Sequence, residues 1–312
     1  MSVFTPVTEA ELAEFLSKYD QGTLAHWQGI EAGTDNTNYF IDTELKGEKR
    51  QFVLTLFENL KAEQLPFFLA LGDHFSANNC KVAEPIHDRQ QQALHSLAGK
   101  PAVLFERLQG KHVPVPNQQH CQQIGLALGD MHQAVGSFQQ QRSNPFGLAW
   151  LLEHQTSGAW GHPEDQALFV ETTNQFKPFL DWSLPTGVIH GDLFHDNALF
   201  DHQENLAGVI DWYFAANDYL VLDLAIVLND WCRHGMSFDS KLVDALVYAY
   251  NSRRPMQAIE TDHLNLFQQM ATCRFWLSRT LAWNVHGDTE LEQVTVLPPE
   301  EMKNLLLLLR EQ

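Results

Sequence analysis

The segments VIHGDLFHDNALF (residues 188–200) and GVIDWYF (residues 208–214) carry most of the information in this sequence. Both contain short apolar strands that end in polar residues, so the strand ends are expected to bring Asp192, Asn197 and Asp211 together. Two carboxylates and an amide at one place suit phosphoryl transfer. One carboxylate can orient an attacking hydroxyl, while the other carboxylate and the amide oxygen can hold magnesium against the phosphate charge. The sequence therefore predicts a phosphoryl-transfer site.

The spacing of these residues supports the same interpretation. HGDxxxxN, which begins at His190, matches the catalytic loop HRDxxxxN of kinases, and Asp211 comes where the DFG aspartate would be expected. The alternative is a plain HGD turn followed by ordinary loop residues. All three residues in one strand context favour a site. We interpret His190 as a structural support of the loop, because His190 and His195 are poorly spaced for a shared metal ion.

This part of the chain resembles the aminoglycoside phosphotransferase and choline kinase superfamily, in which HGD replaces HRD and an aspartate after apolar residues replaces DFG. The resemblance implies ATP as the phosphoryl donor, Asp192 as the catalytic base, and Asn197 and Asp211 as Mg²⁺ ligands. Asp223, in DYLVLDLA, lies where the superfamily has an aspartate that supports the catalytic loop. A plain helix N-cap is the bland role expected for Asp223, and it is compatible with support of the loop.

The N-terminal third is predicted to be a small β-rich lobe. Thr8 and Glu11 have capping-box spacing at the start of a helix over 8–19. Runs rich in β-branched and aromatic residues then predict an antiparallel meander, followed by a helix over 60–75 and a strand at the far side of the same sheet. The predicted strands of this lobe are 24–30, 37–41, 51–57 and 101–108.

The rest of the chain is predicted to be mainly helical, with strands only around residues 188–211. This order predicts an α+β chain of two lobes with a ligand held between them. By the resemblance, the expected fold is of the protein-kinase-like bilobal type, with a nucleotide-binding domain at 1–108 and a catalytic and substrate domain at 109–312. The helices expected in the second domain are 118–138, 163–180, 240–250, 262–283 and 299–310.

By the same resemblance, GIEAGTDNTNYFI (residues 29–41) would be the phosphate-covering turn of the first domain, and FERLQG (residues 105–110) would be the hinge that pairs with adenine. Thr55 stands where kinases carry a phosphate-binding lysine, so either another cation or magnesium substitutes, or the chain is an inactive pseudokinase. The residues expected to bind the nucleotide are Gly33, Asn36, Thr37, Asn38, Thr55, Glu106 and Leu108.

Composition narrows the possible partners. A formal net charge of −19 repels phosphate backbones and anionic lipids, so neither nucleic acid nor a membrane is an expected partner. The four cysteines form no CxxC pair, which is typical of a reducing compartment. The N-terminus lacks the features of a secretory signal, and no apolar run is long enough to cross a bilayer. We expect a cytoplasmic protein.

Over nearly its whole length the chain resembles the homoserine kinases built on this phosphotransferase fold. The resemblance is carried by GTDNTNYFI, FVLTLFENLKAEQLPFFL, LAGKPAVLFERLQGK, RSNPFGLAWL and CRFWLSRTLAW. It implies transfer of the ATP γ-phosphate to L-homoserine for threonine biosynthesis, and it makes Thr55 a family feature. The alternatives are a kinase of another small alcohol, such as choline or an aminoglycoside, and a nucleotide-binding regulator without catalysis.

An amino-acid substrate needs a cation for its carboxylate and an anion or aromatic face for its ammonium group. Arg274 and Arg279 are expected to supply the cation, and Asp218 or Tyr213 the partner of the ammonium group. Pairing of both arginines with structural carboxylates is the alternative. The loop RSNPFG offers two comparable substrate-binding residues, Arg142 and Asn144.

Overall fold

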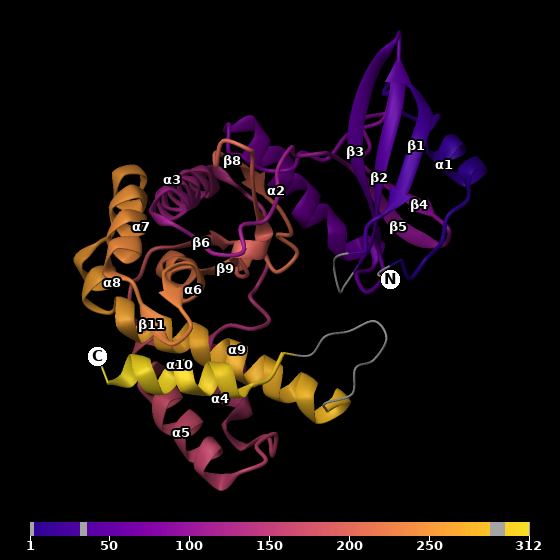
Figure 1. Cartoon of the computed structure of the whole chain (residues 1–312). Coiled ribbons are helices and arrows are strands. Elements are labelled where there is room, and N and C mark those ends of the chain that lie inside the picture. Colours follow the sequence, from indigo (N-terminus) through magenta and orange to yellow (C-terminus); the bar gives the residue numbers. More distant parts are fainter. Residues whose placement is uncertain (1–2, 32–35, 288–296, 312) are drawn as a thin grey trace. The chain divides into compact units, whose positions relative to one another are not determined.

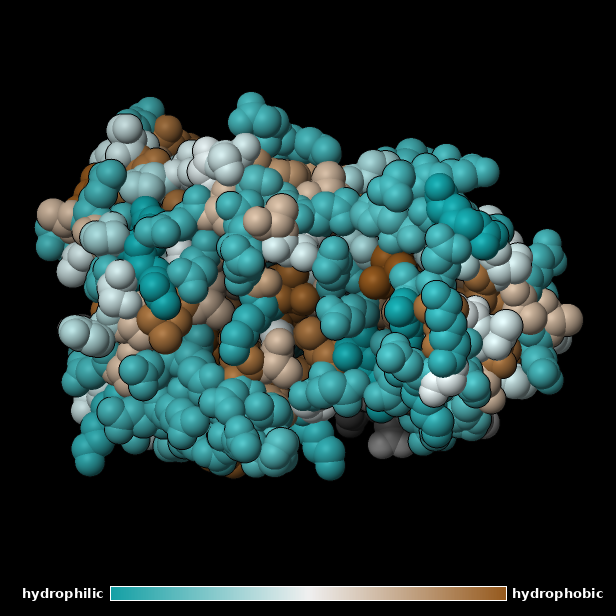
Figure 2. All heavy atoms as spheres, turned by 90° about the horizontal axis from the view of Figure 1, so that it is seen from above, coloured by the Kyte–Doolittle hydropathy of each residue, from teal (hydrophilic) through white to brown (hydrophobic). Residues whose placement is uncertain are grey.

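The structure, a computed structural model, describes residues 3–31, 36–287 and 297–311. The described residues separate into two units, of which unit 1 ends at residue 109 and unit 2 begins at residue 110. Among the described residues, no helix is long and apolar enough to cross a membrane. Hydrophilic residues cover most of the face drawn in Figure 2, as the net charge of −19 leads one to expect.

Unit 1 contains a five-stranded antiparallel sheet in the order β1-β2-β3-β5-β4 (Figure 1). The predicted meander is confirmed. Its strands are longer than expected at the β2–β3 turn, because pairing continues to Leu45↔Glu48. β4 was not predicted, and it forms the outer edge beyond β5. The strands are β1 Thr23–Gly29, β2 Asn36–Leu45, β3 Glu48–Phe57, β4 Leu94–Leu97 and β5 Lys100–Glu106.

Two helices accompany this sheet. α1 (Glu9–Leu16) begins with the predicted capping box between Thr8 and Glu11, and its apolar face buries against the sheet. α2 (Leu65–Ala77) follows the 3₁₀ turn η1 (Ala62–Gln64) and begins later than predicted. Pro66 explains this start, because proline fits the first turn of a helix and not its interior.

Unit 2 is mainly helical. The helix predicted over 163–180 is interrupted after Asn174, close to Pro178, and the helix predicted over 262–283 is preceded by a separate short helix. Its α-helices are α3 Gln118–Ala134, α4 Leu148–Glu153, α5 Pro163–Asn174, α6 Leu220–Trp231, α7 Ser240–Arg253, α8 Ala258–Asp262, α9 Leu264–His286 and α10 Glu300–Arg310. The 3₁₀ turns are η2 Val135–Ser137, η3 His154–Thr156, η4 Lys177–Asp181 and η5 His195–Asn197.

The short strands of unit 2 form two-stranded antiparallel sheets. β6 (Thr186–Ile189) pairs with β9 (Ala216–Tyr219), and β7 (Ala198–Phe200) pairs with β8 (Leu206–Val209). A third pair joins β10 Arg233–His234 to β11 Ser237–Phe238. The first two pairs contain or adjoin the segments 188–200 and 208–214, in which the sequence predicts a phosphoryl-transfer site.

The core of unit 2 is organised around α6, in which all residues except Asp230 are buried. This helix packs against α9, and α10 lies along α9 (Figure 1). α3 packs closely against α7, since a Cβ at Gly125 would overlap the carbonyl oxygen of Leu246. A helix buried on every side provides a rigid base for the loop that contacts it.

Candidate active site

The loop between β6 and β7 turns sharply at Gly191. Its φ of +77° lies in the left-handed region, and a Cβ at this position would come 3.3 Å from the carbonyl oxygen of Phe214. Glycine adopts such a conformation without steric cost. The turn directs the chain from the buried strand end at Ile189 to the partly exposed Asp192.

Asp192 and Asn197 contact each other across this loop. The Asn197 amide nitrogen donates to the Asp192 carbonyl oxygen at 2.8 Å and approaches the Asp192 carboxylate oxygen Oδ2 at 3.4 Å. These contacts hold the Asn197 side chain against the main chain and the carboxylate of Asp192. They also leave the amide oxygen Oδ1 of Asn197 as the atom with which this side chain can bind a cation.

Asp211 lies beside Asn197 because β7 and β8 are neighbours. Ala198 pairs with Val209, and the Ile210 amide donates to the Asn197 carbonyl oxygen at 3.0 Å. Asp211 is exposed and has a φ of +61°, a conformation that costs energy for a residue with a side chain. The structure thus brings Asp192, Asn197 and Asp211 to one end of the β7–β8 hairpin.

His190 connects the two segments of the site. Its Nδ1 accepts a hydrogen bond from the Asp192 amide at 3.2 Å, and its Nε2 donates to the Ile210 carbonyl oxygen at 3.0 Å. An imidazole that accepts at one nitrogen and donates at the other is neutral. Burial holds the pKa of His190 below its ordinary value, which favours the same state.

Asp223, on α6, accepts hydrogen bonds from two main-chain amides of the loop. Its Oδ1 accepts the Gly191 amide at 2.9 Å, and its Oδ2 accepts the His190 amide at 2.7 Å. The expected role as an N-cap is wrong, since the N-cap of α6 is Tyr219. Burial acts to raise the pKa of Asp223, but the hydrogen bonds that its carboxylate accepts from His132 and the Gly191 amide act against burial, and the pKa is lowered.

A series of buried side-chain hydrogen bonds, which the sequence did not predict, extends from Asp223. His132 Nε2 lies 3.1 Å from Asp223 Oδ2, and His132 Nδ1 lies 2.8 Å from the Tyr250 hydroxyl. Arg254 donates to that hydroxyl at 2.9 Å and to both carboxylate oxygens of Glu260 at 2.7 and 3.0 Å. Because the Asp223 carboxylate can only accept, His132 donates to it through Nε2, and the hydroxyl that accepts from Arg254 keeps its own proton to donate to Nδ1 of His132.

Arg274 and Arg279, the two arginines predicted on α9, have different surroundings. Arg274 is 5% exposed and donates to the Gly191 carbonyl oxygen, with the Phe275 ring 4.5 Å from its guanidinium carbon. Burial lowers the pKa of Arg274, opposed by the charges of nearby carboxylates that include Asp192. Arg279 is not brought to the loop, and it donates to Glu301 on α10 at 2.8 Å.

A cavity of ≈ 360 Å³ lies beside β9 and is lined in part by three of the candidate substrate-binding residues. Asp218 pairs with Gly187 of β6 in the strand register, and its Oδ2 accepts the Asn144 amide at 2.6 Å. Arg142 donates to the Ala215 carbonyl oxygen at 2.8 Å. Burial raises the pKa of Asp218. The residues that line this cavity are 141–144, 147–149, 180 and 217–219.

The predicted nucleotide-binding residues of unit 1 lie on both faces of the sheet. The Thr55 hydroxyl donates to Asn38 Oδ1 at 2.7 Å, and these two residues are cross-strand neighbours on one face. Thr37 points to the other face, where its hydroxyl donates to Glu58 at 2.7 Å and accepts the Phe4 amide at 3.0 Å.

Five further predicted residues are those of the neighbouring turns and the aromatic candidate. Asn36 begins β2 and Glu106 ends β5, whereas Leu108 follows that strand although a strand to 108 was predicted. Gly33 lies outside the described residues. Tyr213 is partly buried two residues after Asp211, and its pKa is raised well above the ordinary value by burial.

The model of the phosphotransferase enzyme family matches residues 26–258, which include the whole β6–β9 region. The chain belongs to the phosphotransferase enzyme family. The sequence is also similar to homoserine kinases along nearly its whole length. It is 41% identical to one from Pseudomonas aeruginosa (strain UCBPP-PA14), over 90% of this chain and 89% of the relative. It is 37% identical to one from Neisseria meningitidis serogroup B, over 98% of this chain and 99% of the relative.

Solved structures support the fold of this phosphotransferase. Amicoumacin kinase hAmiN, in complex with AMP-PNP, Ca²⁺ and Ami, has a TM-score of 0.70 at 15% identity, with 98% of this chain and 93% of that chain covered. Choline kinase LicA from Streptococcus pneumoniae has a TM-score of 0.65 at 13% identity, with 97% and 99% covered. Together with the family, these comparisons confirm the α+β kinase-like fold and a small-molecule kinase.

The residues at the hairpin end fit a divalent cation by their chemistry. Asn197 Oδ1 and the Asp211 carboxylate are hard oxygen donors on neighbouring strand ends. Mg²⁺ in kinases is held by one or two such protein groups together with phosphate oxygens. The described residues contain no cluster of three or more His, Cys, Asp or Glu side chains placed to bind a metal ion. Two oxygen donors, Asn197 Oδ1 and the Asp211 carboxylate, fit an ion that also binds the phosphate oxygens of a nucleotide.

Proposed function

We propose that this phosphotransferase transfers the γ-phosphoryl group of ATP to the side-chain hydroxyl of L-homoserine, in the cytoplasm and as a step of threonine biosynthesis. The hydroxyl oxygen forms a bond to the γ-phosphorus, the bond from this phosphorus to the β–γ bridging oxygen breaks, and ADP leaves with O-phospho-L-homoserine as the second product. The observation that carries the proposal is the meeting of Asp192, Asn197 and Asp211 at one hairpin end, in a chain 41% identical to a homoserine kinase.

In this proposal Asp192 is the catalytic base. Its carboxylate lies on a partly exposed loop whose backbone is fixed by His190 and Asp223, so it can accept the hydroxyl proton without a large change of conformation. Asn197 orients it through the contact to Oδ2. Arg274 is proposed to position the loop through its bond to the Gly191 carbonyl oxygen.

Asn197 and Asp211 are proposed to hold Mg²⁺. When bound, the ion supplies positive charge against the phosphate oxygens of the nucleotide. The left-handed backbone at Asp211 is consistent with a functional position, since such strain persists where the surrounding structure and the task require it.

The cavity beside β9 is the proposed site of the amino-acid part of the substrate. Asp218 would accept the ammonium group and Arg142 would bind the carboxylate, with Asn144 fixing Asp218 through their 2.6 Å hydrogen bond. Arg279 is proposed as a structural residue, because its charge is already paired with Glu301. Tyr213 remains a proposed aromatic face near Asp211.

The nucleotide is proposed to bind through unit 1. Asn38 and Thr55 share one sheet face, and the main chain around Glu106 and Leu108 is the proposed adenine contact. The 29–41 turn, with Gly33 and Asn36, would cover the phosphates. The Thr37 side chain is committed to Glu58, which leaves only main-chain atoms of Thr37 for such a role.

A coupled ADP-release assay with L-homoserine, L-serine, choline and kanamycin tests the proposal. We expect the highest kcat/KM with L-homoserine and a requirement for a divalent ion. Preference for choline or kanamycin would overturn the proposed acceptor, and absence of ADP release with every acceptor would favour the regulator without catalysis.

The catalytic base is tested separately. Asp192→Asn should lower kcat by at least about a hundredfold, the usual reach of a positioned base, with little change in stability. Asp196→Asn, an exposed change on the same loop, is the matched control and should retain activity. Wild-type kcat in Asp192→Asn would remove Asp192 from the role of base.

A further inference from the structure

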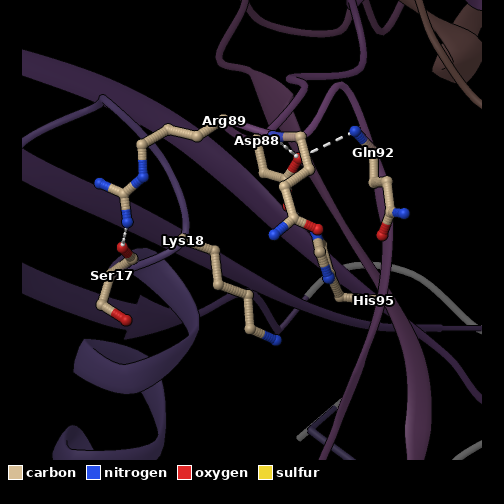
Figure 3. Close-up of a pocket in the computed structure, with 7 residues that line it drawn as sticks. Ser17, Lys18, Asp88, Arg89, Gln92 and His95 are labelled. Carbon is tan, nitrogen blue, oxygen red and sulfur yellow. Dashed lines mark hydrogen bonds and ion pairs between the residues drawn. The ribbon is translucent and has the colours of Figure 1, made fainter.

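A second cavity of ≈ 360 Å³ lies in unit 1, where the chain leaves α1, at the 88–92 turn and at the start of β4. We call it the α1–β4 cavity. Figure 3 shows Lys18, Asp88, Arg89 and His95 gathered around it from these three segments. Its lining consists of Ser17, Lys18, Asp88, Arg89, Gln90, Gln92 and His95. None of these residues belongs to the candidate active site.

The cavity lies on the sheet face that α1 covers. His95 pairs with Ala102, whose side chain belongs to the core cluster that includes α1. The His95 ring packs edge-on against Phe15 and Tyr19, with centroid distances of 5.8 and 5.6 Å. Thr55 and its cross-strand partner are on the opposite face, so the α1–β4 cavity is separate from the proposed nucleotide contacts within unit 1.

Two polar atoms in this corner are buried without a hydrogen-bond partner among the described residues. They are Nε2 of His95, whose side chain is 10% exposed, and the hydroxyl of Tyr19. Nε2 lies 3.3 Å from Asp88 Oδ2 without forming a hydrogen bond to it. Buried polar atoms are nearly always paired, so an unpaired one that lines a cavity indicates a missing partner.

Asp88 is held in place as an anion. Its Oδ1 accepts the Gln90 and Gln92 amides at 2.7 and 2.8 Å, and the bond from Gln92 is the main reason why its pKa is lowered. Burial, followed by the charge of Lys18, lowers the pKa of His95, so the imidazole is neutral at pH 7. Nε2 and Oδ2 therefore form a pair of neighbouring polar atoms that a single cationic donor can bridge.

The opposite charge is supplied by Lys18 and Arg89. The charge of Arg89 is partly compensated, because its guanidinium lies 3.4 Å from the Asp20 carboxylate and also donates to the Ser17 carbonyl oxygen. Lys18 has no ion pair with a carboxylate within the part of the chain that the structure describes, and its ammonium lies 5.7 Å above the Phe15 ring. An ammonium group beside a fixed carboxylate matches a ligand that carries both charges.

We propose that the α1–β4 cavity binds a small zwitterion of the α-amino-acid class, with its ammonium group between His95 Nε2 and Asp88 Oδ2 and its carboxylate on Lys18. The cavity volume lies within the usual range for small-molecule sites, at its lower end. The site is distinct from the substrate site beside β9, and it does not depend on the proposed reaction.

Isothermal titration of the full chain with L-alanine tests this site, because alanine has no hydroxyl to be phosphorylated. Propionate and ethylammonium carry one charge each and serve as matched ligands. We expect L-alanine to bind at least about tenfold more tightly than either, since each loses one charge-assisted contact. Lys18→Met and His95→Phe should weaken alanine binding by at least about tenfold, whereas Lys49→Met on the exposed start of β3 should not.

The outcomes separate this site from the active site. Asp218→Asn should leave the alanine affinity unchanged. No alanine binding at millimolar concentration, binding lost in Asp218→Asn and kept in Lys18→Met, or equal binding of propionate would each overturn the proposal. Lys18→Met keeps the alkyl stem at the end of α1, so loss of binding in that variant does not require loss of folding.

Discussion

Asp223→Asn is the sharpest test of how the loop between β6 and β7 is held. The carboxylate uses Oδ1 for the Gly191 amide and Oδ2 for the His190 amide and His132. An asparagine side chain has one oxygen, so in either orientation its NH₂ group faces one of the two loop amides. That amide then loses its acceptor inside the protein, while His132 can adapt by changing its tautomer.

The cost can be worked from these bonds. A buried donor without an acceptor costs about 1–3 kcal/mol, and replacing a charged acceptor by a neutral one at the remaining amide costs about 1 kcal/mol more. We expect the free energy of unfolding of unit 2 to fall by about 2–4 kcal/mol. Because the loop carries Asp192, a displacement of about 1 Å would also lower kcat by roughly a hundredfold.

Urea denaturation followed by tryptophan fluorescence measures the stability, since all tryptophans except Trp27 lie in unit 2. ADP release measures kcat on the same samples. Asp244→Asn, an exposed change on α7, is the control and should alter neither quantity. An Asp223→Asn protein with wild-type stability and kcat would show that the loop does not depend on this carboxylate.

Gly191→Ala should lower kcat by at least about tenfold and destabilise unit 2 by about 1–2 kcal/mol, because the left-handed backbone is strained for alanine and Cβ would press on the Phe214 carbonyl oxygen; unchanged kinetics would show that the loop tolerates another path. Burial acts to raise the pKa of Glu301, but hydrogen bonds from Arg279 and Arg233 lower it overall. A lowered pKa adds stability that is present above the ordinary value of 4.5 and is lost as the pH falls through the lowered value. Glu301→Gln should therefore be less stable than wild type at pH 7 and lose less stability on acidification from about pH 5 to 3; identical urea midpoints across that range would contradict the assignment.

Local sequence was sufficient to predict where the candidate residues around one hairpin lie. Asp192, Asn197 and Asp211 are separated by short strands and turns, so their spacing alone fixes which strand ends they occupy. The capping box of Thr8 and Glu11 was predictable for the same reason, since both bonds lie within one turn of helix.

The parts that could not be predicted depend on contacts between distant segments. His132 is 91 residues from Asp223 and 118 from Tyr250, and in the sequence it is one more polar residue on an amphipathic helix. Arg274 and Arg279 lie on the same helix, and only packing shows that one meets the loop and the other meets α10. β4 escaped prediction because LHSL is short and half polar, and its pairing with β5 is what makes it a strand.

The attachment of residues 141–144 to β9 bears on how such proteins diversify. The Asn217 amide donates to the Arg142 carbonyl oxygen at 2.7 Å, and Ser143 forms a parallel bridge with Asn217. Main-chain atoms make much of this junction, so mutations can exchange the side chains that face the cavity while the loop between β6 and β7 stays intact. Selection can thus change the lining of this cavity one side chain at a time without rebuilding the main chain that supports it.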